Sequence, residues 1–151
     1  MVDGYALAMI GAAISVGAAA LGAGMAIASN GSAMAGSLTE RPEVFSKTMI
    51  AVVLAEALAI YGLLISIMIL GSATPGMESS EGFIALSAGL AMCLGAIGAG
   101  IGIAYAGAAM TAAVTESPAV GAKSMLAVVL AEALAIYALL IAIMMIGQLG
   151  G

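Results

Sequence analysis

The sequence predicts an all-α membrane protein in which four transmembrane helices form two tandem helical hairpins. Of the 151 residues, 64% are hydrophobic and only 7% are charged. A run of roughly 18 or more apolar residues is long enough to cross a bilayer as a helix. Four runs of this kind are present, at about 5–36, 45–71, 83–113 and 120–147. They lack the polar outer face that a soluble four-helix protein needs, so a lipid bilayer is the expected environment.

An internal repeat divides the chain into two halves. The segment AVVLAEALAIY occurs at 51–61 and again at 127–137, which is an offset of 127 − 51 = 76 in the numbering. Other pairs at this offset are Gly22 with Gly98, Glu40 with Glu116, Pro42 with Pro118, and Lys47 with Lys123. We expect residues 1–75 and 76–151 to form one hairpin each, with a helix, a short polar turn containing proline and a second helix. Both copies run in the same direction, so the repeat is tandem and not inverted.

The first helix of each hairpin is rich in small residues. Small side chains recur every four residues in the first run, at Ala20, Gly24, Ala28, Ser32 and Gly36. The third run has a related pattern in GAIGAGIGIAYAGAAMTAA. Such stripes let helix backbones approach closely in lipid. The pattern fits an inner ring of helices from several copies, and it equally fits ordinary packing within one four-helix unit.

The second helix of each hairpin is bulkier and carries a glutamate. Large side chains dominate AIYGLLISIMILG and AIYALLIAIMMIG, which favours an outer, lipid-facing layer. Glu56 and Glu132 lie near the middle of these runs, far from any basic residue. An ionised carboxylate at the bilayer centre costs roughly 3 kcal/mol or more, so we expect each glutamate to hold a proton or bind a cation. A purely structural glutamate, hydrogen-bonded within the bundle, is the alternative.

A tyrosine follows each glutamate by five residues, at Tyr61 and Tyr137. Five residues turn the side chain about 140° around the helix, but a tyrosine leans back toward the helix N-terminus. Each hydroxyl is therefore a candidate hydrogen-bond donor to the carboxyl of its own or an adjacent hairpin, and would lock the loaded site. Ordinary packing of each tyrosine, with its hydroxyl bonded elsewhere, is the competing interpretation.

The charged residues predict the orientation in the membrane. Arg41, Lys47 and Lys123 are the only basic residues, and all lie in or beside the turns within the hairpins. The acidic Asp3, Glu78 and Glu81 lie at the other end. The positive-inside tendency places the hairpin turns in the cytoplasm and both termini outside.

The glycine-rich helix, the polar turn with RPE or SPA, and the outer helix with LAEALAIY closely resemble the proteolipid subunit of rotary ATPases. The resemblance covers the whole chain, in the duplicated-hairpin form of the V-type and archaeal A-type enzymes. It implies a homo-oligomeric rotor ring in which Glu56 and Glu132 carry ions. It also implies two partners, which are a stator membrane subunit with half-channels and central-stalk subunits at the cytoplasmic loops. Those loops contain Arg41, Pro42 and Glu43 in one hairpin and Glu116 and Pro118 in the other.

One departure from the family pattern bears on the direction of the reaction. Eukaryotic V-type relatives usually keep the carboxylate in one hairpin, whereas this chain has it in both. Each ion that crosses supplies about 2.3 kcal/mol per 100 mV, so more carriers gather more energy for each turn of the ring. A larger number of ions carried per turn favours ATP synthesis and indicates an A-type enzyme in the cell membrane of an archaeon or a bacterium.

The residues around the glutamates favour protons over sodium. Sodium needs several oxygen ligands, which sodium-carrying relatives supply from the inner helix and from positions beside the carboxylate. Here these positions are apolar: Ile27 and Ile103 on the inner helices, and Ala57, Leu58, Ala133 and Leu134 after the carboxylates. We therefore expect H+ to be the transported ion, with Na+ on the same rotor as the alternative.

Other functions fit the sequence less well. A small multidrug/proton antiporter also has four short spans, but it normally carries its carboxyl near the first span and uses aromatic residues to bind cations. A purely structural or pore-forming oligomer would leave both carboxyls unexplained. The sequence has no phosphate-binding loop followed by Lys-Ser or Lys-Thr, so we expect no enzyme activity from the chain by itself. We also expect no cofactor, no resident metal and no nucleic-acid partner.

Overall fold

The computed structural model of the chain describes residues 2–149. Four long helices follow one another, and a single-turn 3-10 helix precedes the second and the fourth. In chain order the elements are α1 (Gly4–Glu40), η1 (Pro42–Val44), α2 (Phe45–Ser72), α3 (Ser79–Glu116), η2 (Pro118–Val120) and α4 (Gly121–Ile146). All four α-helices are long and apolar enough to cross a membrane. The predicted all-α class with four transmembrane helices is confirmed.

Proline determines where the inner helices α1 and α3 end. A residue before proline is disfavoured in the helical conformation, and Arg41 accordingly has φ −139° and ψ 84°. Ser117, before Pro118, adopts nearly the same angles, φ −138° and ψ 98°. The polar residues preceding these positions stay helical. α1 and α3 therefore run on to Glu40 and Glu116, beyond the expected ends at 36 and 113.

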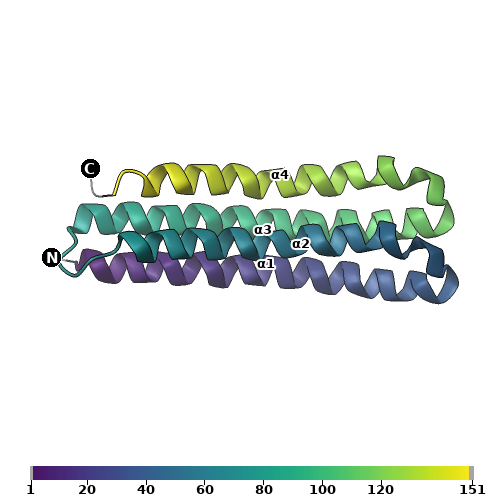
Figure 1. Ribbon diagram of the computed structural model, residues 1–151, viewed down its shortest axis with the longest axis horizontal. Coiled ribbons are helices and arrows are strands. Elements are labelled where there is room, and N and C mark those ends of the chain that lie inside the picture. The colour runs from purple at the N-terminus through teal and green to yellow at the C-terminus, as the bar shows by residue number, and fades with distance from the viewer. Residues whose placement is uncertain (1, 150–151) are drawn as a thin grey trace.

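The four helices lie side by side, with both hairpin turns at one end and the connection between α2 and α3 at the other (Figure 1). The basic residues Arg41, Lys47 and Lys123 belong to the turn end. At the opposite end α3 begins with a capping box, in which the Glu78 and Glu81 side chains each bond the backbone of the other. The charge segregation predicted from the sequence is thus a segregation between the two ends of the bundle.

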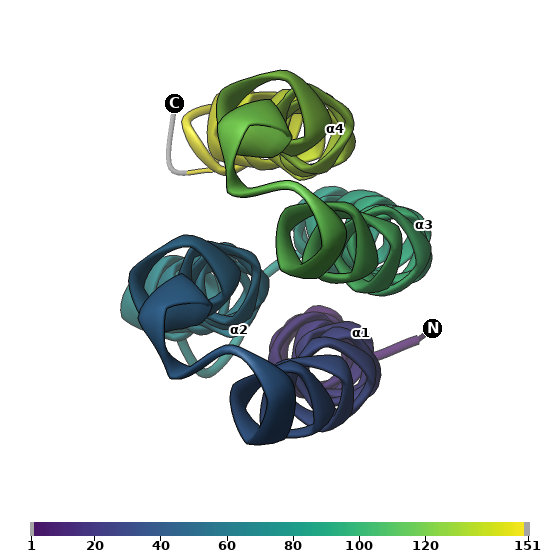
Figure 2. The same cartoon turned by 90° about the vertical axis from the view of Figure 1, so that its right-hand side faces the viewer.

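The end-on view shows two layers, with α1 and α3 in one and α2 and α4 in the other (Figure 2). Glycines bring the backbones of α1 and α3 together. A Cβ atom added to Gly100 would stand 2.5 Å from the Gly22 carbonyl oxygen, and one added to Gly11 would stand 2.8 Å from the Ala85 carbonyl oxygen. Only glycine allows this approach, which gives the small-residue composition of the inner helices a structural reason.

The stripe of small residues singled out in the sequence lies on another face of α1. Gly24 and Gly36 have nothing within 4 Å of an added Cβ. Ala20, Ala28 and Ser32 are also exposed. Small residues occupy several faces of α1, so their spacing alone does not identify the face that packs within the chain. This stripe remains open on the single chain.

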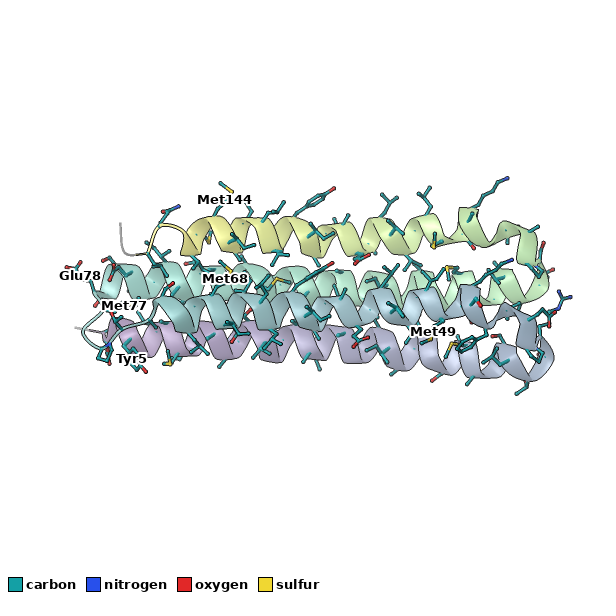
Figure 3. The ribbon with its side chains drawn as sticks, in the orientation of Figure 1. Tyr5, Met49, Met68, Met77, Glu78 and Met144 are labelled. Atoms are coloured by element: carbon teal, nitrogen blue, oxygen red, sulfur yellow. The ribbon has the colours of Figure 1, made fainter. Side chains whose placement is uncertain are left out.

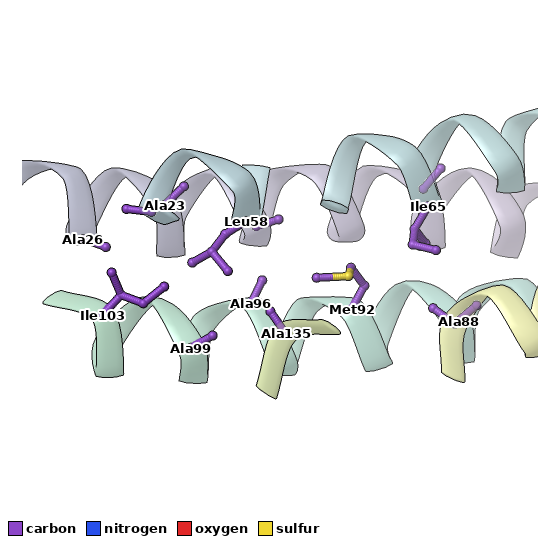
Figure 4. Packing of buried hydrophobic residues seen from close by; sticks show 14 of the residues in the cluster. Ala23, Ala26, Leu58, Ile65, Ala88, Met92, Ala96, Ala99, Ile103 and Ala135 are labelled. Carbon is purple, nitrogen blue, oxygen red and sulfur yellow. The ribbon is translucent and has the colours of Figure 1, made fainter. Parts of the chain in front are cut away.

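Small side chains and a smaller number of large ones from both layers meet in the core. Figure 4 shows this packing around Ala23, Ala26, Leu58, Ile65, Ala96, Ala99 and Ile103. On the outer layer, large apolar side chains are exposed, among them Ile60 and Ile67 of α2 and Leu130 and Met144 of α4. Met144 points away from the bundle (Figure 3). An exposed apolar surface of this kind is suited to contact with lipid.

Candidate ion-carrying site

The two glutamates occupy equivalent positions on the outer helices. Each lies the same distance along the chain from the first residue of its helix, since 56 − 45 = 11 for Glu56 in α2 and 132 − 121 = 11 for Glu132 in α4. At about 1.5 Å per residue, each carboxyl is roughly 16 Å along its helix from the turn end. The lysines of α2 and α4, Lys47 and Lys123, lie in the first turn of each helix, so neither can neutralise a carboxyl at that depth.

Glu132 pairs with a residue of the other hairpin. The Tyr61 hydroxyl of α2 donates a hydrogen bond to Glu132 Oε1 of α4, with an oxygen–oxygen distance of 3.1 Å. Both side chains are half-buried. The sequence left open whether a tyrosine would reach its own hairpin or the adjacent one, and the structure pairs Tyr61 with the adjacent one. A carboxyl that accepts this bond can still hold a proton on its other oxygen.

Glu56 and Tyr137 have no corresponding contact in the described part of the chain. Glu56 is exposed, and Tyr137 is 61% exposed. Their neighbours in sequence match those of Glu132 and Tyr61 residue for residue over residues 51–61 and 127–137. The difference therefore arises from position. α4 lies next to α2 in the outer layer, whereas no other outer-layer helix of the described chain lies beyond α4 or on the free side of α2.

Two apolar residues that the sequence places at about the level of the glutamates are buried in the core. Leu58 on α2 and Ile103 on α3 are both 0% exposed and belong to the core. Within residues 2–149, no group of three or more His, Cys, Asp or Glu side chains is placed to hold a metal ion. The Tyr61–Glu132 pair combines one hydroxyl and one carboxyl, which is enough to hold a proton, whereas a cation such as Na+ needs several oxygen ligands.

The nearest polar residues of α1 bond to backbone groups. Asn30 is fully buried, and its Nδ2 donates to the carbonyl oxygens of Ala51 (3.1 Å) and Ile103 (3.3 Å). The Ser29 hydroxyl donates to the Ala104 carbonyl oxygen at 3.1 Å. These bonds tie α1 to α2 and α3. The sequence does not reveal the role of this pair, because its partners are carbonyl groups that no side-chain pattern indicates.

Comparison with known proteins decides the family. The model of the family described as the C subunit of ATP synthase matches the chain twice, at residues 10–69 and 86–145. The chain belongs to this family. Each match lies in one helical hairpin, and each includes one of the two glutamates. Membership in this family, together with four apolar helices, identifies an integral membrane protein.

Three relatives of similar length are proteolipid (c) subunits of V-type proton ATPases. The 16 kDa proteolipid (c) subunit of the V-type proton ATPase of Rattus norvegicus is 33% identical over 118 residues, which cover 78% of this chain and 76% of the relative. The protein of the same name from Homo sapiens is 32% identical over the same length. The c subunit of the V-type proton ATPase of Candida tropicalis is 30% identical over 118 residues, covering 78% and 74% of the two chains. The resemblance to duplicated-hairpin proteolipid subunits is confirmed.

Proposed function

We propose that this chain is a rotor-ring subunit of an A/V-type ATP synthase or ATPase and carries protons on Glu56 and Glu132. The observation that carries the proposal is a carboxyl near the middle of an apolar helix, closed by the Tyr61 hydroxyl and remote from any basic residue. In this state a protonated carboxyl is neutral and can face lipid, whereas an ionised one is excluded from it. The chain would contribute ion transfer to the complex and no chemistry on ATP.

Ring assembly would complete the second site. Moving the Tyr61–Glu132 pair by one hairpin replaces Tyr61 with Tyr137, at the offset of 76, and Glu132 with Glu56 of the following copy. Copies placed side by side would bring Tyr137 of one copy next to Glu56 of the next. Each chain would then provide two proton sites, one within itself and one shared with its neighbour.

The ring needs partners to convert proton flow into rotation. A stator subunit with two half-channels would deprotonate each carboxyl on one side of the membrane and reload it from the other. Central-stalk subunits would dock at the polar turns around Arg41 and Pro118. Each proton would contribute about 2.3 kcal/mol per 100 mV of membrane potential, and two carriers per chain favour ATP synthesis.

The orientation follows from charge. All three basic residues lie at the turn end of the bundle, which favours a cytoplasmic location for the turns and an external one for the termini. The two glutamates per chain favour the cell membrane of an archaeon or a bacterium. The named relatives in rat, human and yeast are eukaryotic.

Carbodiimide labelling tests the proposal. We expect the reagent to modify Glu56 and Glu132 and to stop ATP-linked proton uptake in membrane vesicles that contain the complete enzyme. Labelling of both glutamates without loss of transport would refute the carrier role. Protection of the glutamates by sodium at constant pH would show that the carried ion is Na+.

A further inference from the structure

Two side-chain contacts link the hairpins with the same separation in sequence. The Tyr61 hydroxyl bonds Glu132, 132 − 61 = 71 residues away. At the turn end, Lys47 Nζ donates to the Pro118 carbonyl oxygen at 2.7 Å, 118 − 47 = 71 residues away. Both contacts run from the first hairpin to the second, so one geometric relationship between the hairpins produces both.

The repeat predicts where this relationship acts again. In the next contact of the same kind, Lys47 is replaced by Lys123, 76 residues later, and Pro118 is replaced by Pro42, 76 residues earlier. Lys123 and Pro42 are both exposed. In a single chain they lie on opposite flanks, because Lys123 belongs to the last hairpin and Pro42 to the first.

We propose that Lys123 of one copy clasps the polar turn of the next copy, donating to its Pro42 carbonyl oxygen and packing along its Phe45 ring. The clasp rests on the proposed function, since it names the contact that joins neighbours in the rotor ring. Repetition of one head-to-tail interface closes into a ring when the rotation between copies divides a full turn.

Phe45 makes this clasp different from the one within the chain. Lys47 passes over Gly121, and its Cδ lies 3.3 Å from the place of an added Cβ on that glycine. The residue at the offset of 76 before Gly121 is Phe45, which is 47% exposed. The backbone angles agree, with φ −50° and ψ −49° at Gly121 and φ −45° and ψ −55° at Phe45. At this spacing the flexible lysine stem of a neighbour would shift by a few tenths of an ångström to admit the Phe45 side chain, and its methylene groups would then pack against that side chain in place of a glycine.

The same relationship fixes the register of the inner helices between copies. Within the chain Gly11 and Gly89 approach so closely that a Cβ on Gly89 would lie 2.8 Å from the Gly11 Cα. The offset converts this pair into Ser87 of one copy and Ala13 of the next, and both residues are exposed. Their Cβ atoms would hold the two backbones farther apart than the glycines do, but would leave the two residues facing each other. The clasp thus comes with a specific pair of facing residues that can be measured independently.

Oxidative cross-linking tests the register. In a Cys93→Ser background, which removes the single free cysteine, Ala13→Cys with Ser87→Cys should link neighbouring copies into a ladder of multimers. The matched control, Ala20→Cys with Ser87→Cys, keeps the same flank but moves one cysteine by seven residues, or about 10.5 Å. We expect at least roughly tenfold less linkage in the control, because that gap exceeds disulfide reach. Equal linkage of both pairs, or linkage of the control alone, would overturn the register.

Ring stability in detergent tests the clasp itself. We expect Lys123→Met and Phe45→Ala each to reduce the fraction of intact rings that survives heating, by roughly threefold, and Lys123→Arg to preserve it. Lys47→Met is the matched control, because its bond lies within one chain and its loss leaves the contacts between copies in place. Equal loss in Lys47→Met and Lys123→Met, or no loss in either, would refute the clasp.

The two proposals fail in different ways. Rings that form, bind carbodiimide at both glutamates and transport protons, yet do not cross-link through Ala13→Cys and Ser87→Cys, would reject only the clasp and its register. A wild-type chain that never oligomerises in membranes, or rings whose transport is indifferent to carbodiimide, would reject the proposed function.

Discussion

The two glutamates of this chain have identical local sequences and different surroundings. Glu132 accepts a hydrogen bond from Tyr61 and is half-buried between the hairpins, whereas Glu56 is exposed on the open flank of α2. The contrast shows that the eleven-residue segment around each glutamate does not make a site by itself. In the proposed rotor, a closed site would need the outer helix of one hairpin and the tyrosine of the hairpin before it.

The inner helices also differ between the hairpins, here in the polar residues that bond a neighbouring helix. Ser29 and Asn30 of α1 bond carbonyl groups of α3, while the residues at the offset of 76 are Tyr105 and Ala106. Tyr105 is 79% exposed. The contact between hairpins within a chain therefore contains a polar tie whose residues are not repeated in the second hairpin. If copies assemble as proposed, the ring alternates two interfaces that share their geometry and differ in their stability.

The largest expected effect is the loss of either glutamate, and it should be the same for both. We expect Glu56→Gln and Glu132→Gln each to abolish coupled proton transport, because a carboxamide cannot release a proton and every site must pass the stator in turn. ATP-driven acidification of vesicles with the complete enzyme measures this. Persistent transport in Glu56→Gln alone would mean that only the site completed within the chain works as a carrier.

Glycine substitutions compare the packed flank with the open one. Gly100→Leu should destabilise the single chain by roughly 1–3 kcal/mol or more, because its side chain would enter the Gly22 backbone. Gly24→Leu should leave the single chain nearly unchanged, since that position is open. Unfolding of the detergent-solubilised monomer by denaturant measures both. Equal destabilisation by Gly100→Leu and Gly24→Leu would contradict the assignment of Gly22 to the packed face of α1 and of Gly24 to its open face.

The sequence predicted the elements of this fold well and their contacts poorly. Apolar runs and prolines identify helices and turns because both act locally along the chain. The spacing around Gly24 predicts close helix packing, either between copies or within one chain. Within the chain, α1 uses Gly11 and Gly22 instead, since helix rotation depends on neighbours. The glutamates stood out as charges in apolar runs. The partner of Glu132 did not, because the choice between hairpins requires three-dimensional arrangement.

Removing the polar tie should weaken the interface within the chain and spare that between copies. Asn30→Ala loses two hydrogen bonds to the carbonyls of Ala51 and Ile103, and we expect a cost of roughly 1 kcal/mol. Ser32→Ala is the control, because the Ser32 hydroxyl bonds only the Ala28 carbonyl of its own helix. The denaturant midpoint of the monomer should fall for Asn30→Ala alone. An equal fall of the midpoint in Ser32→Ala would show that the Asn30 hydrogen bonds between helices do not stabilise the chain specifically.

The smallest expected effect concerns the hydrogen bond that distinguishes the two glutamates. In the isolated chain, carbodiimide should label Glu56 faster than Glu132, because Glu56 is exposed and has no tyrosine partner among the described residues. Tyr61→Phe should raise the labelling rate of Glu132 by about fivefold, corresponding to a bond worth roughly 1 kcal/mol. Tyr137→Phe should change neither rate in the isolated chain, yet speed the labelling of Glu56 once rings have formed. An effect of Tyr137→Phe on the monomer, or none on the ring, would mean that the second site is closed in another way and that the two halves of the molecule differ in more than position.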